Sequence, residues 1–291
     1  MRLSRSERIF DIVNVTALLL ISATMIIPLV HVMAVSLSET AAVMRNDVEL
    51  WPVGMNWDNY LLVLENKRFV HALMVTLFVV TVGTLLNMIL TVFTSYPLSR
   101  SYFQARRFMT LFVIFTMVFQ APLIPAYLLV RDIGILDTIW ALILPSALSA
   151  FNMIICITFL RSLPEELFEA ARIDGMSERR IVTSIVTPLS KPILFTLLLF
   201  YAVFHWNSYY GALIYITNPD LRPLQLYIYM MLNQGETNTM LSSASQFATL
   251  DTSPQGLQMA TVILATIPIV IVYPFIQKHF IKGSLVGSLK E

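Results

Sequence analysis

The sequence is poor in charged residues, contains a single cysteine and carries almost no net charge. Charged residues make up 13% of its 291 residues, whereas an ordinary soluble domain has about one quarter, so a soluble enzyme is not the expected class. Cys156 alone cannot form an internal disulfide, and cysteine-based zinc sites need several ligands. A net charge of +1 provides no overall basic field for nucleic acid, which we therefore do not expect as a partner.

The sequence also lacks the short motifs of two enzyme classes. It contains neither an HExxH zinc pair nor a GxxxxGK[ST] phosphate-binding loop. We therefore predict no catalytic residue and no metal site in this chain. Any transport driven by ATP would need partner subunits that hydrolyse it.

Apolar residues are abundant instead and fall into long runs. Hydrophobic residues make up 57% of the chain, and six stretches without Lys, Arg, Asp or Glu exceed the roughly 20 residues with which a helix crosses a bilayer. Strands of a membrane barrel would be shorter, with alternating polarity. We therefore predict an all-α polytopic membrane protein that forms a single transmembrane domain over residues 1–291. The six predicted transmembrane helices span about residues 12–36, 70–98, 108–130, 138–160, 192–215 and 257–277.

The distribution of basic residues predicts the orientation of the chain. If the N-terminus lies inside, the inner segments contain fourteen Lys and Arg and the outer segments five. Cytoplasmic loops are enriched in these residues, so we expect both termini in the cytoplasm. Two long connections are then an inner loop over residues 161–191 and an outer loop over residues 215–256. The first apolar run is too long for a signal peptide, so we expect it to be retained.

Few polar residues lie within the predicted spans. The segment over residues 205–210 differs from the rest, because it places imidazole, indole, amide and phenol groups on successive faces of one helix. Such groups suit hydroxyl-rich solutes such as sugars, and they equally suit hydrogen bonds between neighbouring helices. The candidate residues of a substrate path are His205, Trp206, Asn207, Tyr209, Tyr210, Asn152 and Gln120.

The inner loop is predicted to contain two short helices. Ser162 and Glu165 have the spacing of a capping box, and Gly175 would end a helix that begins near Pro164. Ser177 stands where it would cap the second helix.

On the first of these helices we expect one apolar, small-sided face. It would consist of Leu167, Ala170, Ala171 and Asp174, which recur at helical spacing with Phe168 beside them. Small side chains allow another backbone to approach closely, and Glu169 offers a carboxylate to a basic residue. Two interpretations remain open: the helix fits a groove of a partner protein, or it lies among lipid headgroups.

The inner loop also carries a resemblance to a known family. Its segment EAARIDGMSERRIVTSIVTPLSKP closely resembles the EAA loop, EAA...G.........I.LP, of the membrane permease subunits of ABC importers fed by a solute-binding protein. The Asp before the Gly and the closing P-L-x-K-P are similar to the carbohydrate branch, which is related to the maltose permeases. SYPLSR, HWNSYYGALIYI and QMATVILATIPIVIVYPFIQKHFIKGSLVGSLK resemble further segments of that branch. Pro97, Gly211 and Ala212 depart from its pattern.

This resemblance implies the type I ABC importer permease architecture in a bacterial cytoplasmic (inner) membrane, and a transport subunit that is not an enzyme. The implied partners are a second homologous permease, two ATPase subunits that bind ATP and Mg, an extracytoplasmic solute-binding protein, an oligosaccharide and membrane lipid. The residues implied in coupling to the ATPase are Glu169, Ala170, Ala171, Asp174 and Gly175. The tail over residues 282–291 would reach toward the ATPase dimer interface, and the outer loop would face the binding protein.

Two other functional classes of membrane protein would show different sequence features. A secondary transporter or channel for a small polar solute, working without ATPase subunits, would need ionisable groups inside the membrane or matched broken helices. A membrane enzyme would need His205 as an acid or base, and no Asp or Glu of the same span would orient it. The spans offer no Lys or Arg to an anionic solute, and both a neutral oligosaccharide and a uronate remain open.

Overall fold

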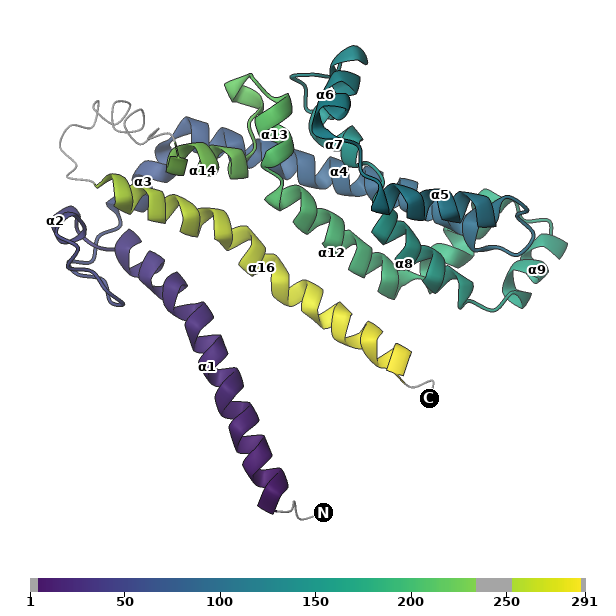
Figure 1. The fold of residues 1–291 in the computed structure, drawn as a ribbon, viewed down its shortest axis with the longest axis horizontal. Coiled ribbons are helices and arrows are strands. Elements are labelled where there is room, and N and C mark those ends of the chain that lie inside the picture. The colour runs from purple at the N-terminus through teal and green to yellow at the C-terminus, as the bar shows by residue number, and fades with distance from the viewer. Residues whose placement is uncertain (1–4, 234–252, 289–291) are drawn as a thin grey trace. The chain divides into compact units, whose positions relative to one another are not determined.

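The structure is a computed structural model that describes residues 5–233 and 253–288, and all regular structure in these ranges is helical (Figure 1). The prediction of an all-α protein is therefore confirmed for this part of the chain. The middle of the predicted outer loop and the last residues of the predicted C-terminal tail lie outside the described residues.

The chain packs as two units, of which the first comprises residues 1–70 and 228–268. It contains α1 (Arg5–Ser36), α2 (Thr40–Met44), α3 (Asp58–Glu65) and the first part of α16 (Pro254–Ser288). The hydroxyls of Ser36 and Tyr60 lie 2.6 Å apart, and Asn59 Nδ2 donates to the Ser36 carbonyl oxygen at 3.2 Å. These bonds fasten α3 to the end of α1.

The second unit comprises residues 71–227 and 269–291. It contains most of α4 (Lys67–Ser99) and a series of shorter helices. These are α5 (Arg106–Val118), α6 (Leu123–Asp132), α7 (Trp140–Ile143), η1 (Leu144–Ser146), α8 (Ala150–Arg161), α9 (Glu166–Ile173), α10 (Glu178–Ile181), η2 (Val182–Val186), α11 (Thr187–Leu189), α12 (Lys191–Asn207), α13 (Tyr210–Tyr215), η3 (Pro219–Leu221) and the first part of α14 (Leu224–Asn233).

Three helical segments are each long and apolar enough to cross a membrane. They are Arg8–Ser36, Lys67–Ser99 and Pro254–Val272. Three further helix pairs reach that length only together, so the described residues supply three spans, or up to six if each bent pair is one span.

Two of the bent pairs lie on predicted spans, and the third joins the end of the predicted inner loop to the fifth predicted span. α5 and α6 meet at 114°, and Pro122 stands directly before α6, where it lacks an N–H and restricts the preceding residue. The α7–η1 segment meets α8 at 49°, with Pro145 inside η1. The segment over residues 178–189 meets α12 at 88°. The runs over residues 108–130 and 138–160 are therefore apolar throughout without being single straight helices.

Candidate functional site

The helix predicted to contact a partner is α9, and its end is built as the sequence indicated. The Gly175 N–H donates to the Arg172 carbonyl and the Met176 N–H to the Ala171 carbonyl, both at 3.0 Å, and Gly175 has φ +73°. This is the left-handed closing turn that glycine adopts at least cost. The start differs, because Ser162 Oγ bonds the Phe159 carbonyl at 2.7 Å and Glu165 precedes the helix without capping it. The predicted capping box is wrong, since Ser162 closes α8 instead.

The two faces of α9 also differ from the predicted face. Phe168 and Ala171 are buried in a cluster with residues of α4, α8 and the helices that follow, while Leu167, Ala170 and Asp174 are exposed. Successive residues are 100° apart around a helix, so Phe168 and Ala171 share one side of α9. This side is the buried one, because burying the large Phe168 ring removes the most apolar surface from water. Ala170 and Ala171 therefore lie on different faces. The exposed face consists of Glu166, Leu167, Glu169, Ala170, Ile173 and Asp174.

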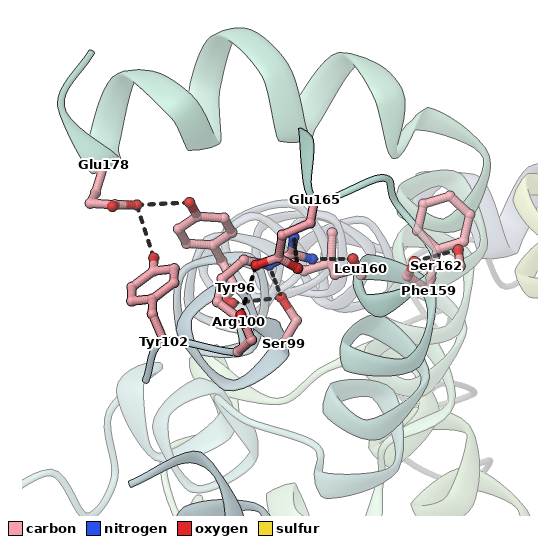
Figure 2. A network of polar contacts seen from close by, with 10 residues as sticks. Tyr96, Ser99, Arg100, Tyr102, Phe159, Leu160, Ser162, Glu165 and Glu178 are labelled. Carbon is pink, nitrogen blue, oxygen red and sulfur yellow. Dashed lines mark hydrogen bonds and ion pairs between the residues drawn. The ribbon is translucent and has the colours of Figure 1, made fainter. Parts of the chain in front are cut away.

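The buried face of α9 contacts Arg100, the residue that follows the C-terminal end of α4. Figure 2 shows Arg100 among Ser99, Leu160 and Glu165. The Arg100 side chain is 1% exposed. Its guanidinium carbon lies 4.0 Å from the centre of the Phe168 ring, and its Nη2 donates to the Leu160 carbonyl in the last turn of α8. Its Nε donates to Ser99 Oγ at 2.9 Å, and Nη1 lies 3.9 Å from Glu165 Oε2. Burial lowers the pKa of Arg100, and the Glu165 carboxylate opposes that effect.

A second polar cluster is centred on Glu178, at the start of α10. Figure 2 shows the hydroxyls of Tyr96 and Tyr102 directed at its carboxylate, with which they form hydrogen bonds of 2.7 and 3.2 Å. Arg172 of α9 donates to the same carboxylate from Nε at 3.2 Å and stacks on the Tyr102 ring at 4.0 Å. Burial raises the pKa of Glu178, but the bonds from Tyr96 and Arg172 outweigh it, so the pKa is lowered overall.

The sequence did not predict that Arg100, Phe168 and Glu178 lie in one region of the structure. The SYPLSR segment, which ends at Arg100, carries only a family resemblance, and nothing in its spacing indicates a partner in the inner loop. The available signal was a single arginine at the end of an apolar span. A buried charge needs partners, and these come from segments distant in sequence.

Deeper in the second unit, a polar network joins three helices. His205 Nε2 of α12 lies 3.3 Å from Asn87 Oδ1 of α4, and Asn87 Nδ2 donates to the Ser146 carbonyl of η1 at 2.8 Å. The hydroxyls of Thr91 and Tyr201 lie 2.7 Å apart. In this conformation His205 thus serves as a helix–helix contact, the second of the two roles considered for it.

The other candidate path residues are divided between buried and exposed positions. Trp206 and Asn152 are buried, whereas Asn207, Tyr210 and Gln120 are exposed. The expectation of one helix over residues 205–210 is wrong, because α12 ends at Asn207 and α13 begins at Tyr210. The Tyr209 and Tyr210 rings meet edge to face with centroids 6.5 Å apart. The exposed aromatic pair therefore belongs to the break between two helices.

The described start of the outer loop is fixed to the second unit. Asp137 Oδ1 accepts hydrogen bonds from the backbone N–H groups of Thr217 and Asn218, each at 2.9 Å. The Leu224 N–H donates to Thr76 Oγ1 of α4 at 2.7 Å.

An all-helical chain with three to six candidate membrane spans among its described residues belongs to the class of polytopic membrane proteins. Residues 7–284 match the family described as the binding-protein-dependent transport system inner membrane component, and the chain belongs to this family. It is therefore an inner membrane permease subunit of a transporter that works with a binding protein. This family does not fit a secondary transporter or channel.

Comparisons with individual proteins cover nearly the whole chain. Protein LplC of Bacillus subtilis (strain 168) is 38% identical over 289 residues, which are 99% of this chain and 97% of LplC. The polygalacturonan/rhamnogalacturonan transport system permease protein YtcP of the same organism is 37% identical, over 98% of this chain and 99% of YtcP. A solved structure of a bacterial ABC transporter involved in the import of the acidic polysaccharide alginate contains a chain that is 32% identical, with a TM-score of 0.91 and coverage of 96% of this chain and 99% of that one.

Proposed function

We propose that the chain crosses the membrane six times, with both termini in the cytoplasm, and forms half of the path of an ATP-driven importer. A second homologous permease completes the path, two ATPase subunits bind ATP and Mg, and an extracytoplasmic binding protein delivers the solute. Three long apolar helices and three bent pairs are the candidates for the six crossings, and in the third pair we assign the crossing to α12 and the residues that follow it. The excess of Lys and Arg in the inner segments supports this orientation.

The observation that carries this proposal is the exposed face of α9. Ile173 on this face is 86% exposed, and Glu169 and Ala170 lie beside it. An apolar residue next to a small side chain and a carboxylate suits a groove with an apolar floor and a basic rim on an ATPase subunit. Lipid headgroups fit less well, because Glu166 and Glu169 would face an anionic membrane surface.

The proposed solute is an oligosaccharide released from an acidic polysaccharide. This proposal rests on the similarity over almost the full length to a polygalacturonan/rhamnogalacturonan permease and to a chain of an alginate importer. The exposed Tyr210 and Asn207 at the break between α12 and α13 are suited to sugar rings and hydroxyls. The positive charge that a uronate needs would come from the partner permease or the binding protein.

The coupling role is tested by reversing the charge of Glu169 or by forcing the end of α9 to change. Glu169→Lys places a cation at the expected basic rim, and Gly175→Pro cannot adopt the φ of +73° that ends the helix. We expect both variants to insert into the membrane while ATP-dependent uptake into proteoliposomes of the full complex falls roughly tenfold or more, equivalent to about 1.4 kcal/mol.

Asp132→Lys is the matched control, since Asp132 is an exposed acid at the end of α6. Normal uptake by both α9 variants would refute the coupling role. The solute is tested in the same vesicles with galacturonate oligomers and neutral glucose oligomers. Equal uptake of the two would refute the acidic substrate while leaving the importer function standing.

A further inference from the structure

Arg100 lies in the second unit, where α4, α8 and α9 meet. Arg100 follows α4 and bonds the last turn of α8 through the Leu160 carbonyl (Figure 2). Its guanidinium also stacks on Phe168 of α9. Its Nε bond to Ser99 fixes the guanidinium relative to its own helix. One side chain thus contacts all three elements at once.

A lysine or an apolar residue would not make the same set of contacts. Among the residues with described burial, Arg100 is the only Lys, Arg, Asp or Glu in the buried class, although burying a charge is costly and an apolar side chain would fill the same space at lower cost. Only the planar guanidinium stacks on a ring while donating in two directions within its plane. The buried Arg100 thus fixes the relative positions of its neighbours at some cost in folding stability.

The position of Phe168 explains what this geometry does for α9. The helix has eight residues, and its outer face is exposed from Glu166 to Ile173. Its inner face is held by the packing of Phe168 and Ala171, by Arg100 and by the Arg172–Glu178 pair, whose shortest N–O distance is 3.2 Å. A force applied to the outer face reaches α4 and α8 through these contacts, through the 2.9 Å bond from Ser101 to Glu165 and through the chain connection over residues 162–165.

From this we propose that Arg100 is a positioning residue that fastens the coupling helix α9 to α4 and α8, so that displacement of α9 by the ATPase moves these helices. The proposal rests on the proposed function of α9. The Phe168 ring is the part of α9 that Arg100 holds, and the Leu160 carbonyl is its anchor on α8. Loosening this contact lets α9 follow the ATPase while the spans lag behind.

The test compares Arg100→Lys and Phe168→Leu in the complete complex with its second permease, ATPase subunits and binding protein. Arg100→Lys keeps the charge and loses the planar stack, and Phe168→Leu keeps an apolar side chain and loses the ring. The measured quantity is the number of ATP molecules hydrolysed per oligosaccharide imported. We expect it to rise roughly threefold or more in each variant, the size expected when coupling between distant sites is weakened.

Arg161→Lys is the matched control. Arg161 ends α8, and its Nη2 donates to the Leu98 carbonyl at 3.3 Å, so it also bridges α8 and α4 while its described bond does not involve α9. We expect its ratio of ATP to solute to stay at the wild-type value. The double variant Arg100→Lys/Phe168→Leu should be no worse than the poorer single variant, because both changes remove one shared contact.

Retention of the ATPase subunits on the tagged permease separates positioning from folding. The proposal is overturned if assembled variant complexes keep the wild-type ratio, if the two changes add independently, or if uptake falls only in proportion to lost assembly. If the wild-type complex itself imports solute without ATP, the proposed function fails. An unchanged ratio in an ATP-driven wild-type background removes the role of Arg100 alone.

Discussion

Replacing Gly83 by Ala tests how closely α4 packs against His205 of α12. A Cβ at position 83 would lie 2.6 Å from His205 Nε2 and 2.8 Å from Cε1, where ordinary contact begins at 3.4 Å. The ring has little freedom to retreat, because it is buried, hydrogen-bonded to Asn87 at 3.3 Å and in edge-on contact with Phe204. The added methyl group must therefore displace the ring or separate the two helices.

The expected loss follows from three effects. Overpacking a filled interior costs roughly 1–3 kcal/mol, and losing the bond between His205 and Asn87 costs about 0.5–1.5 kcal/mol. Alanine regains about 1 kcal/mol, because glycine is a poor helix former. The free energy of unfolding should therefore fall by roughly 0.5–3.5 kcal/mol, since the first two effects outweigh the third.

Thermal unfolding of the purified protein in detergent measures this loss as a melting temperature lowered by several degrees. Gly211→Ala is the matched control, because a Cβ there meets only Tyr215 Cδ2, at 4.0 Å. In a His205→Ala background the ring is absent, so adding Gly83→Ala should cost nothing. The reasoning is refuted if Gly83→Ala melts like Gly211→Ala, or if it costs the same with and without the His205 ring.

Two further predictions concern Glu178, at the start of α10, and Asp137, which bonds the backbone after α13. The pKa of Glu178 is lowered in the folded protein, so its stabilising contribution is full above the unfolded carboxyl pKa and is lost as pH falls through the folded one. Melting between about pH 6 and pH 3 should therefore depend less on pH in Glu178→Gln than in the wild type, and parallel curves would contradict this. Asp137 has φ +58° and accepts two hydrogen bonds from backbone N–H groups. Asp137→Ala should therefore lower the free energy of unfolding by about 1–3 kcal/mol. Asp137→Asn keeps an acceptor and tolerates this φ, so it should melt close to the wild type.

The elements that depend on local sequence could be predicted. Long uncharged runs correspond to apolar helices, and Gly175 ends α9 because the need for a left-handed residue is a property of a single position. Pairings between distant segments could not be predicted, since the contact of Arg100 with Phe168 has no signature in either segment alone. The face of α9 was misplaced for a related reason: periodicity indicates an apolar stripe, but packing against neighbours decides which part of it is buried.

The breaks were missed because an apolar run does not reveal the direction of its helix. Hydropathy records only that residues avoid water, and Phe119 before the break and Leu123 after it are equally apolar. Proline gives a signal for a bend without fixing its size, since the bends near Pro122 and Pro145 are 114° and 49°. Membrane proteins can accommodate such bends where neighbouring groups take up the freed backbone bonds. Asn87 illustrates this, because its side chain donates to the Ser146 carbonyl beside the second break.

Helix α4 takes part both in the contact between Arg100 and Phe168 and in the polar network around His205. Its C-terminal end leads into Arg100, which stacks on Phe168 of α9, while its middle carries Asn87 and Thr91, which contact His205 and Tyr201 of α12. A shift of α4 at its base therefore cannot leave the polar network unchanged, because a helix transmits displacement along its axis and hydrogen bonds tolerate only small changes in distance. If α9 moves α4 as proposed, Arg100→Lys tests this connection at the C-terminal end of α4 and Gly83→Ala tests the packing of its middle against α12.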